Sequence, residues 1–199
     1  MGKDIRNMRL WTIQSVDVYD QVMSTGGYSV NLDHPESLGR EYKDAYAWLR
    51  GKAVERGLVD NGRGMIWSWY RRGALHRKPD VRTLRKTNMP GSLLCCLTLE
   101  VPDDKVLLMD SNQWCCRLNG SACMTAEEEA MDWEELDRHL NAIWALPEED
   151  QRKYTESTWD LIFDTSRASW VEAVFFGLDR SMVRGVQFFV GEGSDPFNL

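Results

Sequence analysis

The sequence of 199 residues predicts one α+β domain, with a mixed or antiparallel sheet and helices packed around it. Two observations carry this prediction. Segments with strand-like and helix-like patterns follow in the order strand, two helices, strand, basic loop, two strands, helices, two strands. The helices are grouped in the sequence, whereas a parallel sheet would require them to alternate with strands. Since no repeat, low-complexity tract or linker divides the chain, residues 1–199 are expected to form a single domain, with a loose tail at 191–199.

In the first half, residues 8–14 are expected to form a strand with mixed faces, and Ser15 is a suitable N-cap for a helix over 16–24 that two glycines end. Residues 28–32 are expected to be extended, and Pro35 can open a second helix. The clearest helix covers 41–56, where apolar residues recur at helical spacing.

In the second half, a continuous apolar run at 93–101 predicts a buried strand, and we expect it to pair with a strand at 105–109 as a hairpin. Thr125 and Glu128 form a capping-box pattern for a helix that reaches about Trp144. A further helix is expected over 151–163, followed by strands at 170–178 and 183–190.

The net charge of −7 argues against a general nucleic-acid binder, but the charge is unevenly distributed. Seven Lys or Arg residues and one acid lie between Arg71 and Lys86, and acids gather at 127–137 and 148–150. The five cysteines fit neither a disulfide framework nor a zinc spacing, so we expect free thiols, no metal and a cytoplasmic location. We find no signal peptide and no apolar stretch of membrane-spanning length.

The strand predicted at 66–70 is expected to carry Trp67, Trp69 and Arg71 on one face, and it continues into a loop rich in Arg and Lys. Aromatic surface beside clustered positive charge suits a ligand that has rings and phosphates. The alternative is a core strand followed by a solvated basic loop, because Trp is largely buried in most folds.

Glu172 opens an otherwise apolar strand, and a carboxylate in that position can be a catalytic group at the mouth of a cleft. The alternative is an edge-strand charge that prevents aggregation. The chain has no Gly-x-Ser-x-Gly elbow, no Walker loop and no Gly-x-Gly-x-x-Gly after a strand. The acids at 127–129 are read as a solvated first helical turn and not as a metal site.

Several segments, spread over almost the whole chain, form a recognisable set. They are Leu-Trp-Thr-Ile-Gln at 10–14, Met-Ile-Trp-Ser-Trp at 65–69, Lys-Pro-Asp-Val-Arg at 78–82, Val-Leu-Leu-Met-Asp at 106–110 with Trp114, Ser-Thr-Trp at 157–159 with Ile162 and Phe163, and 183–189. Together they resemble an uncharacterised bacterial family, the domain-of-unknown-function family 3841, whose name states no function.

The order of elements also resembles the ADP-ribosyltransferase fold. There, a first strand carries an Arg or His that holds NAD, a middle strand carries an aromatic residue or Ser, and a late strand begins with a catalytic Glu. The resemblance implies that Glu172 is catalytic and that NAD is bound as a substrate, without a metal. The Arg or His position falls at about Thr12, a departure from the pattern. The NAD-binding residues that the resemblance implies are Thr12, Gln14, Trp67, Trp69, Tyr70, Arg71, Arg72 and Arg82.

Two hypotheses follow. The chain is a mono-ADP-ribosyltransferase-like enzyme of a toxin or phage-defence kind, which modifies a nucleic acid or a protein. The alternative is a non-catalytic module that binds a nucleotide, a nucleic acid or a protein through its Trp and Arg surface. An enzyme requires Glu172, Thr12 or Gln14, and the strand at 66–70 to converge on one cleft, whereas a module requires only the aromatic and basic residues to share a face.

Overall fold

The computed structural model describes residues 6–30, 42–73 and 75–193. The chain divides into two compact units, the first made of residues 1–108 and 169–199 and the second of residues 109–168. Compactness does not establish independent folding, so the single domain stays a prediction. The expected helix start at Pro35 and most of the expected tail lie outside the described residues.

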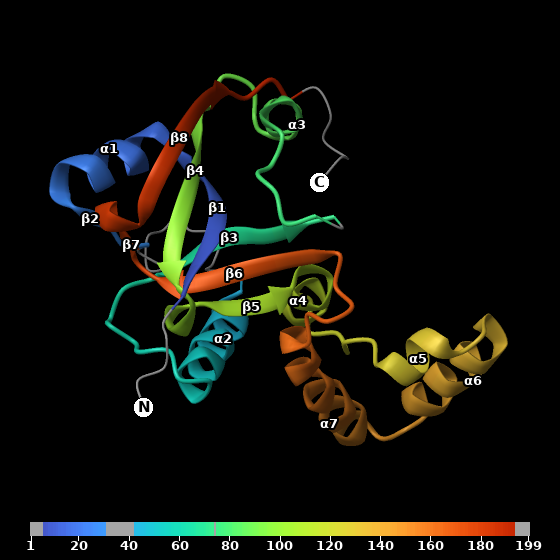
Figure 1. Cartoon of the computed structure of the whole chain (residues 1–199). Helices are drawn as coiled ribbons and strands as arrows, with labels where there is room; N and C mark the ends of the chain where they lie inside the picture. Colours follow the sequence, from blue (N-terminus) through green and yellow to red (C-terminus); the bar gives the residue numbers. More distant parts are fainter. Residues whose placement is uncertain (1–5, 31–41, 74, 194–199) are drawn as a thin grey trace. The chain divides into compact units, whose positions relative to one another are not determined.

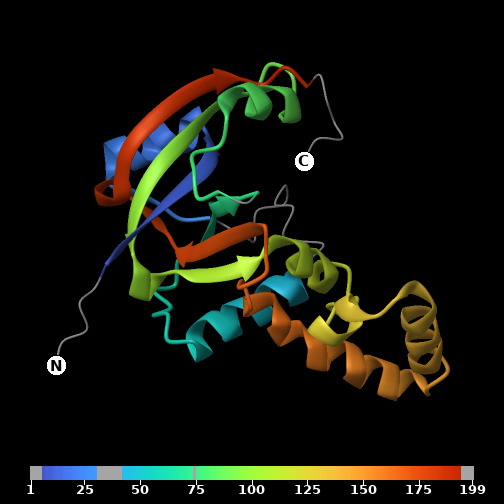
Figure 2. The same cartoon turned by 45° about the vertical axis from the view of Figure 1, so that its right-hand side comes forward.

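A six-stranded sheet organises the first unit, and its strand order is β5-β6-β3-β1-β4-β8. Neighbouring strands are antiparallel from β6 through to β8, so the predicted class of an α+β chain with an antiparallel sheet is confirmed. Figures 1 and 2 show the strong twist between β4 and β8 on one side and β3 and β6 on the other. The strands are β1 (Asn7–Ser15), β3 (Met65–Arg72), β4 (Leu93–Pro102), β5 (Leu107–Asp110), β6 (Trp170–Phe176) and β8 (Val183–Val190).

Each face of the sheet has its own apolar core, because side chains alternate along the strands. One core contains Leu10, Ile66, Cys95 and Phe175 and is covered by α1 (Val16–Thr25). The other contains Trp11, Leu84 and Cys96, with Leu84 contributed by α3 (Val81–Thr87). The adjacent Cys95 and Cys96 therefore belong to different cores.

The helix α2 (Lys43–Glu55) packs on the same face as Trp11, over β3 and β6. Its Tyr46 ring meets the Trp67 ring edge to face, with 5.8 Å between the centroids. Its Arg50 lies 5.2 Å from the centroid of the Phe176 ring. Since α3 covers β1, β4 and β8 on this face, the two helices cover different parts of it.

The predicted hairpin between residues 93–101 and 105–109 is wrong. A 3-10 turn, Asp103–Lys105, separates the two strands, and β4 lies between β1 and β8 while β5 neighbours β6 at the edge. The long apolar run of β4 has a partner on both sides, nine residues of β1 on one and β8 on the other. A partner strand on each side and an apolar core on each face explain why most of this strand is apolar.

A small second sheet, β2 (Gly27–Tyr28) with β7 (Leu178–Asp179), is fixed by Arg63. Its guanidinium donates to the Asp179 carboxylate at 2.6 Å and to the carbonyl oxygens of Tyr28 at 2.6 Å and Leu178 at 3.0 Å. A 3-10 turn, Arg180–Met182, then leads from β7 into β8.

The second unit is helical, and its division differs from the prediction. The helix expected over 125–144 is two helices, α5 (Ala126–Ala130) and α6 (Trp133–Trp144), because Asp132 forms a second capping box with Glu135. The next helix, α7 (Glu148–Thr158), begins earlier than expected, and a 3-10 helix at Trp159–Phe163 continues it. The sequence patterns missed α3 and α4 (Ser111–Leu118), which are capped by Asp80 and Asp110. In the described part of the chain, no helix has the length and apolar character needed to cross a membrane.

Candidate functional site

One row of side chains crosses the three neighbouring strands β1, β3 and β6. Trp11 lies opposite Trp69, and Trp69 lies opposite Glu172. Directly opposed residues on antiparallel strands point to the same face, so the two Trp rings and the carboxylate share one face. Trp11 is buried, whereas Trp69 and Glu172 are half-buried and can reach a ligand.

The helix α2 contributes Tyr46 to the surroundings of Glu172. Burial raises the pKa of the Tyr46 phenol, and the negative charge of Glu172 raises it further. The phenol therefore lies within electrostatic range of the carboxylate and stays protonated at neutral pH. With the ring of Trp67 against Tyr46, the carboxylate has aromatic neighbours from both the sheet and the helix.

Arg72 adds a positive charge to the same face. It pairs with Trp170, which is two residues before Glu172 and hence on the same side of β6. The Arg72 guanidinium carbon lies 5.3 Å from the ring centroids of both Trp69 and Trp170, within the range of cation–π attraction. Burial lowers the pKa of Arg72, although the group remains a cation at neutral pH.

A β-bulge in β3 explains why Arg72 and not Arg71 joins the row. The register shifts between Trp69 and Arg71, so that Arg71 lies opposite Val171 on the other face. The intervening Tyr70 stacks on the ring of His76, with 4.4 Å between the centroids. The prediction from strict alternation, that Arg71 shares the face of the two Trp residues, is therefore wrong.

Thr12 and Gln14 lie on the opposite face from Glu172, where their neighbours on β4 belong to the core under α1. The Thr12 hydroxyl donates to the Trp67 carbonyl oxygen at 2.7 Å and accepts from the Gln14 amide at 2.8 Å. With Thr12 only 1% exposed, these contacts tie β1 to β3. The structure thus brings together Trp67, Trp69, Arg72 and Glu172 but not Thr12, Gln14 or Arg71.

Tyr70 lines a separate cavity of about 490 Å³ on the Trp11 side of the row. His76 connects the two regions, because its ring also meets the Trp11 ring edge to face at 5.0 Å. Its Nε2 atom lies 2.9 Å from the Arg9 carbonyl oxygen. Two arginines, Arg6 and Arg9, and two acids, Glu100 and Asp103, line this cavity, and Arg9 pairs with Glu100 at 3.2 Å.

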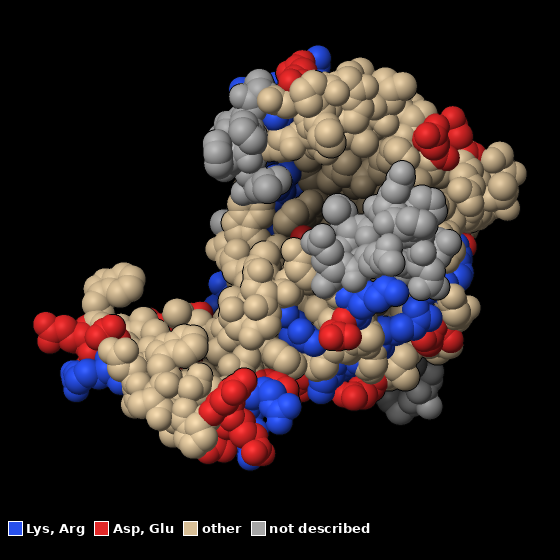
Figure 3. Space-filling model, turned by 180° about the vertical axis from the view of Figure 1, so that it is seen from behind, with Lys and Arg blue, Asp and Glu red and all other residues tan. Residues whose placement is uncertain are grey.

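The basic stretch is not one continuous loop, since α3 occupies its second half. Arg82 is exposed and its guanidinium pairs with the Asp80 carboxylate at 2.6 Å, next to the N-cap of α3. Lys78 donates to the Gln187 side chain at 2.6 Å across the sheet. Basic and acidic side chains are intermixed on the surface seen from behind (Figure 3), so they do not merge into one positive field there.

The sequence analysis missed three members of the site, Trp11, Tyr46 and Trp170. Trp170 could have been found, because its spacing of two from Glu172 puts both on one face of a strand. Trp11 depends on strand register and Tyr46 on helix packing, and neither is visible in local sequence. Among the described residues, no three or more His, Cys, Asp or Glu side chains are grouped as a metal would require, and all five cysteines are free thiols.

The arrangement is a carboxylate at the base of an aromatic surface, with a cation beside it. It can bind a flat, positively charged ring and stabilise positive charge that develops next to it. No curated protein and no solved structure matches this chain. The family model described as domain of unknown function (DUF3841) matches residues 9–183, and the chain therefore belongs to this family.

Proposed function

We propose that the chain is an NAD-dependent ADP-ribosyltransferase-like enzyme in which Glu172 is the catalytic carboxylate. The observation that carries the proposal is the row Trp11, Trp69 and Glu172 across the first, middle and late strands. These are the three strands on which such transferases carry their NAD-binding and catalytic residues. The resemblance asks for an aromatic residue or Ser on the middle strand and a Glu on the late strand, and Trp69 and Glu172 supply them side by side. Thr12 and Gln14 face the other way, so the convergence expected of an enzyme is met by Trp69 and Glu172 alone.

The proposed reaction breaks the bond between nicotinamide and ribose. The bonding electrons leave with the nicotinamide ring, which loses its positive charge, while positive charge develops on the ribose. The carboxylate of Glu172 stabilises that charge, and its half-buried position strengthens the attraction relative to water. A nucleophile of the acceptor then bonds to the ribose carbon and gives up its proton to the carboxylate or to water.

The aromatic residues serve to hold the cationic nicotinamide ring before it leaves. Trp67 and Trp69 offer ring faces, and the Arg72 guanidinium, stacked on Trp69 and Trp170, is positioned for the pyrophosphate. The cavity beside Trp11 supplies Tyr70, His76 and Arg9 for the remaining nucleoside. In this proposal Thr12 and Gln14 position β1 instead of contacting NAD. Arg82 is given no role in NAD binding, because its guanidinium is already paired with the Asp80 carboxylate.

The decisive experiment measures NAD consumption by the purified full chain and by Glu172→Gln, with water and with candidate protein and nucleic-acid acceptors. Loss of one preorganised electrostatic group should lower the rate roughly 100- to 1000-fold. Since Gln keeps the volume and polarity of Glu, the melting temperature should hardly change. The matched control is Glu129→Gln, a carboxylate of the second unit that pairs with Arg167 and has no role in the proposed chemistry.

The binding-module alternative makes the opposite forecast. If wild-type protein turns over no NAD with any acceptor, or if Glu172→Gln retains full turnover, the enzyme proposal fails. Retained binding of a nucleotide or a single strand that weakens with salt and with Arg72→Gln would then support the module, since each neutralised phosphate releases counterions. The observation that favours this second candidate is the Arg72 guanidinium, which lies 5.3 Å from the ring centroids of both Trp69 and Trp170.

A further inference from the structure

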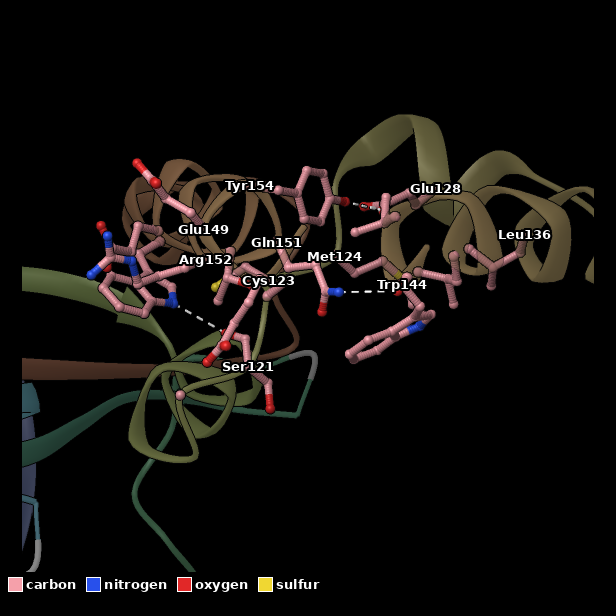
Figure 4. Close-up of a pocket in the computed structure, with 18 residues that line it drawn as sticks. Ser121, Cys123, Met124, Glu128, Leu136, Trp144, Glu149, Gln151, Arg152 and Tyr154 are labelled. Carbon is pink, nitrogen blue, oxygen red and sulfur yellow. Dashed lines mark hydrogen bonds between the residues drawn. The ribbon is translucent and has the colours of Figure 1, made fainter. Parts of the chain in front are cut away.

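The second unit contains an apolar groove that is independent of the proposed NAD site. A cavity of about 950 Å³ lies between α6 and α7, above the segment 120–124 (Figure 4). Leu136, Leu140, Ile143 and Trp144 of α6 line one wall at helical spacing. None of the residues of α6 is buried, so the apolar face of this helix is turned toward open space in its unit.

Two tryptophans extend this apolar stripe to both ends of α6. Trp133 is 87% exposed and Trp144 is 68% exposed, whereas Trp is highly buried in most folds. They are eleven residues apart, which is three helical turns or roughly 16 Å. Trp is also the residue type most enriched at the energetic centres of protein interfaces. A stripe of this length could contact a bound helix of about three turns along its whole length.

The groove is held in shape by polar contacts between its helices. The Gln151 amide donates to the carbonyl oxygens of Trp144 at 3.0 Å and Leu146 at 2.8 Å, which fixes the turn between α6 and α7. Glu128 of α5, only 5% exposed, accepts from the Tyr154 hydroxyl of α7 and lies 3.2 Å from His139 of α6. All three helices are thus linked through one carboxylate, so a ligand would meet a preformed surface.

The charge of the second unit indicates which kind of ligand the groove can attract. Residues 109–168 contain fourteen Asp or Glu and five Lys or Arg. Glu148, Glu149 and Glu156 lie along the cavity wall formed by α7, together with Arg152. An acidic rim around an apolar groove attracts cations and repels anionic partners such as nucleic acids and acidic lipid surfaces.

We propose that this groove binds a basic amphipathic helix of a partner protein. The apolar side chains of such a helix, at positions i, i+3, i+4 and i+7, enter the groove against Leu140 and Trp144. Its Lys and Arg residues face the Glu side chains of α7. The groove belongs to the second unit alone and does not depend on the Glu172 chemistry.

The test uses the full chain and a fluorescent model peptide of fourteen residues made of Leu and Lys at those spacings. Binding is followed by anisotropy, beside a scrambled peptide of the same composition and a peptide with Glu in place of Lys. The Leu–Lys peptide should bind with a Kd of about 10 μM or tighter, and both comparison peptides at least about tenfold more weakly. Raising the salt from about 0.05 to about 0.5 M should weaken binding several-fold.

Exposed positions allow variants that leave the fold intact. Trp144→Gln should weaken binding of the Leu–Lys peptide at least about tenfold. Glu148→Lys combined with Glu149→Lys should weaken that binding to the same extent and remove its salt dependence. The control is Val59→Gln, an 83% exposed apolar residue in the first unit, which should have no effect. Equal binding of the scrambled peptide, equal binding by the variants, or no binding at about 100 μM peptide would overturn the proposal. A dimer of the chain that Trp144→Gln dissociates would show instead that a second copy occupies the groove.

Discussion

Gly177 connects β6, which carries Glu172, to β7, and its replacement by Ala should destabilise the first unit strongly. Its φ angle of +71° lies in the left-handed region, where an Ala costs about 1–2 kcal/mol. An added Cβ would also overlap Nε and Cζ of Arg63. The Arg63 side chain must therefore leave its position and lose its contacts to Asp179 and to two carbonyl oxygens.

The magnitude follows from these two contributions. Each contact of a half-buried guanidinium contributes about 0.5–1 kcal/mol, so loss of the three adds roughly 2 kcal/mol to the cost of the backbone. We expect Gly177→Ala to lower the free energy of unfolding by about 3–4 kcal/mol. Gly26→Ala is the matched control, because Gly26 has φ +92° with no atom within 4 Å of an added Cβ. It should cost only the backbone contribution of about 1–2 kcal/mol.

Urea denaturation, followed by circular dichroism, measures both variants. A second comparison places Gly177→Ala in an Arg63→Met background, where the overlap is relieved and the additional cost should fall to that of Gly26→Ala. The reasoning is refuted if Gly177→Ala and Gly26→Ala lower the free energy of unfolding equally when Arg63 is unchanged. It is also refuted if the Arg63→Met background leaves the cost of Gly177→Ala unchanged.

Two further predictions concern the second unit and the thiols. Burial alone would raise the pKa of Glu128, but hydrogen bonds from Tyr154 and Thr125 lower it below the ordinary value of 4.5. Glu128→Gln should therefore destabilise α5 to α7 by about 1–3 kcal/mol above pH 4.5, and the difference should shrink as the pH falls further, because the carboxylate's contribution is lost on protonation. Hydrogen exchange across residues 126–158 at pH 7 and pH 4 checks this, and a difference that grows in acid would contradict it. Burial raises the pKa of Cys95 to about 11 and that of Cys123 to about 12, whereas Cys115 is exposed. Iodoacetamide at pH 7.5 should modify Cys115 first and the two buried thiols only after unfolding, as mass spectrometry of peptides would show; early modification of Cys95 would argue against its burial.

Local signals in the sequence determined much of the secondary structure. The extended segment at 8–14 and the alternation at 66–70 predict β1 and β3, and Ser15 and Gly26 bound α1 as expected. The Thr125 capping box starts α5. These signals depend on residues within a few positions of one another, which is why they are readable without a structure.

Signals failed where a local pattern was ambiguous. Short helices such as α3 and α4 offer too few turns for an apolar period, and Asp80 and Asp110 are their main markers. The apolar runs at 93–102 and 107–110 resemble a hairpin because they are close in sequence. In the structure three other strands of the sheet, β6, β3 and β1, lie between them.

For the candidate site, the sequence alone determined that Trp67 and Trp69 share a face and that Glu172 begins an apolar strand. Tertiary structure decided which residues join them. The register of β1 against β3 puts Trp11 in the row and turns Thr12 to the opposite face, and the bulge after Trp69 exchanges Arg71 for Arg72. A shift of one residue reverses the face of every side chain that follows it, and the hydrogen bonds that set the register join residues more than fifty positions apart. Only the folded sheet could therefore specify which residues surround the carboxylate.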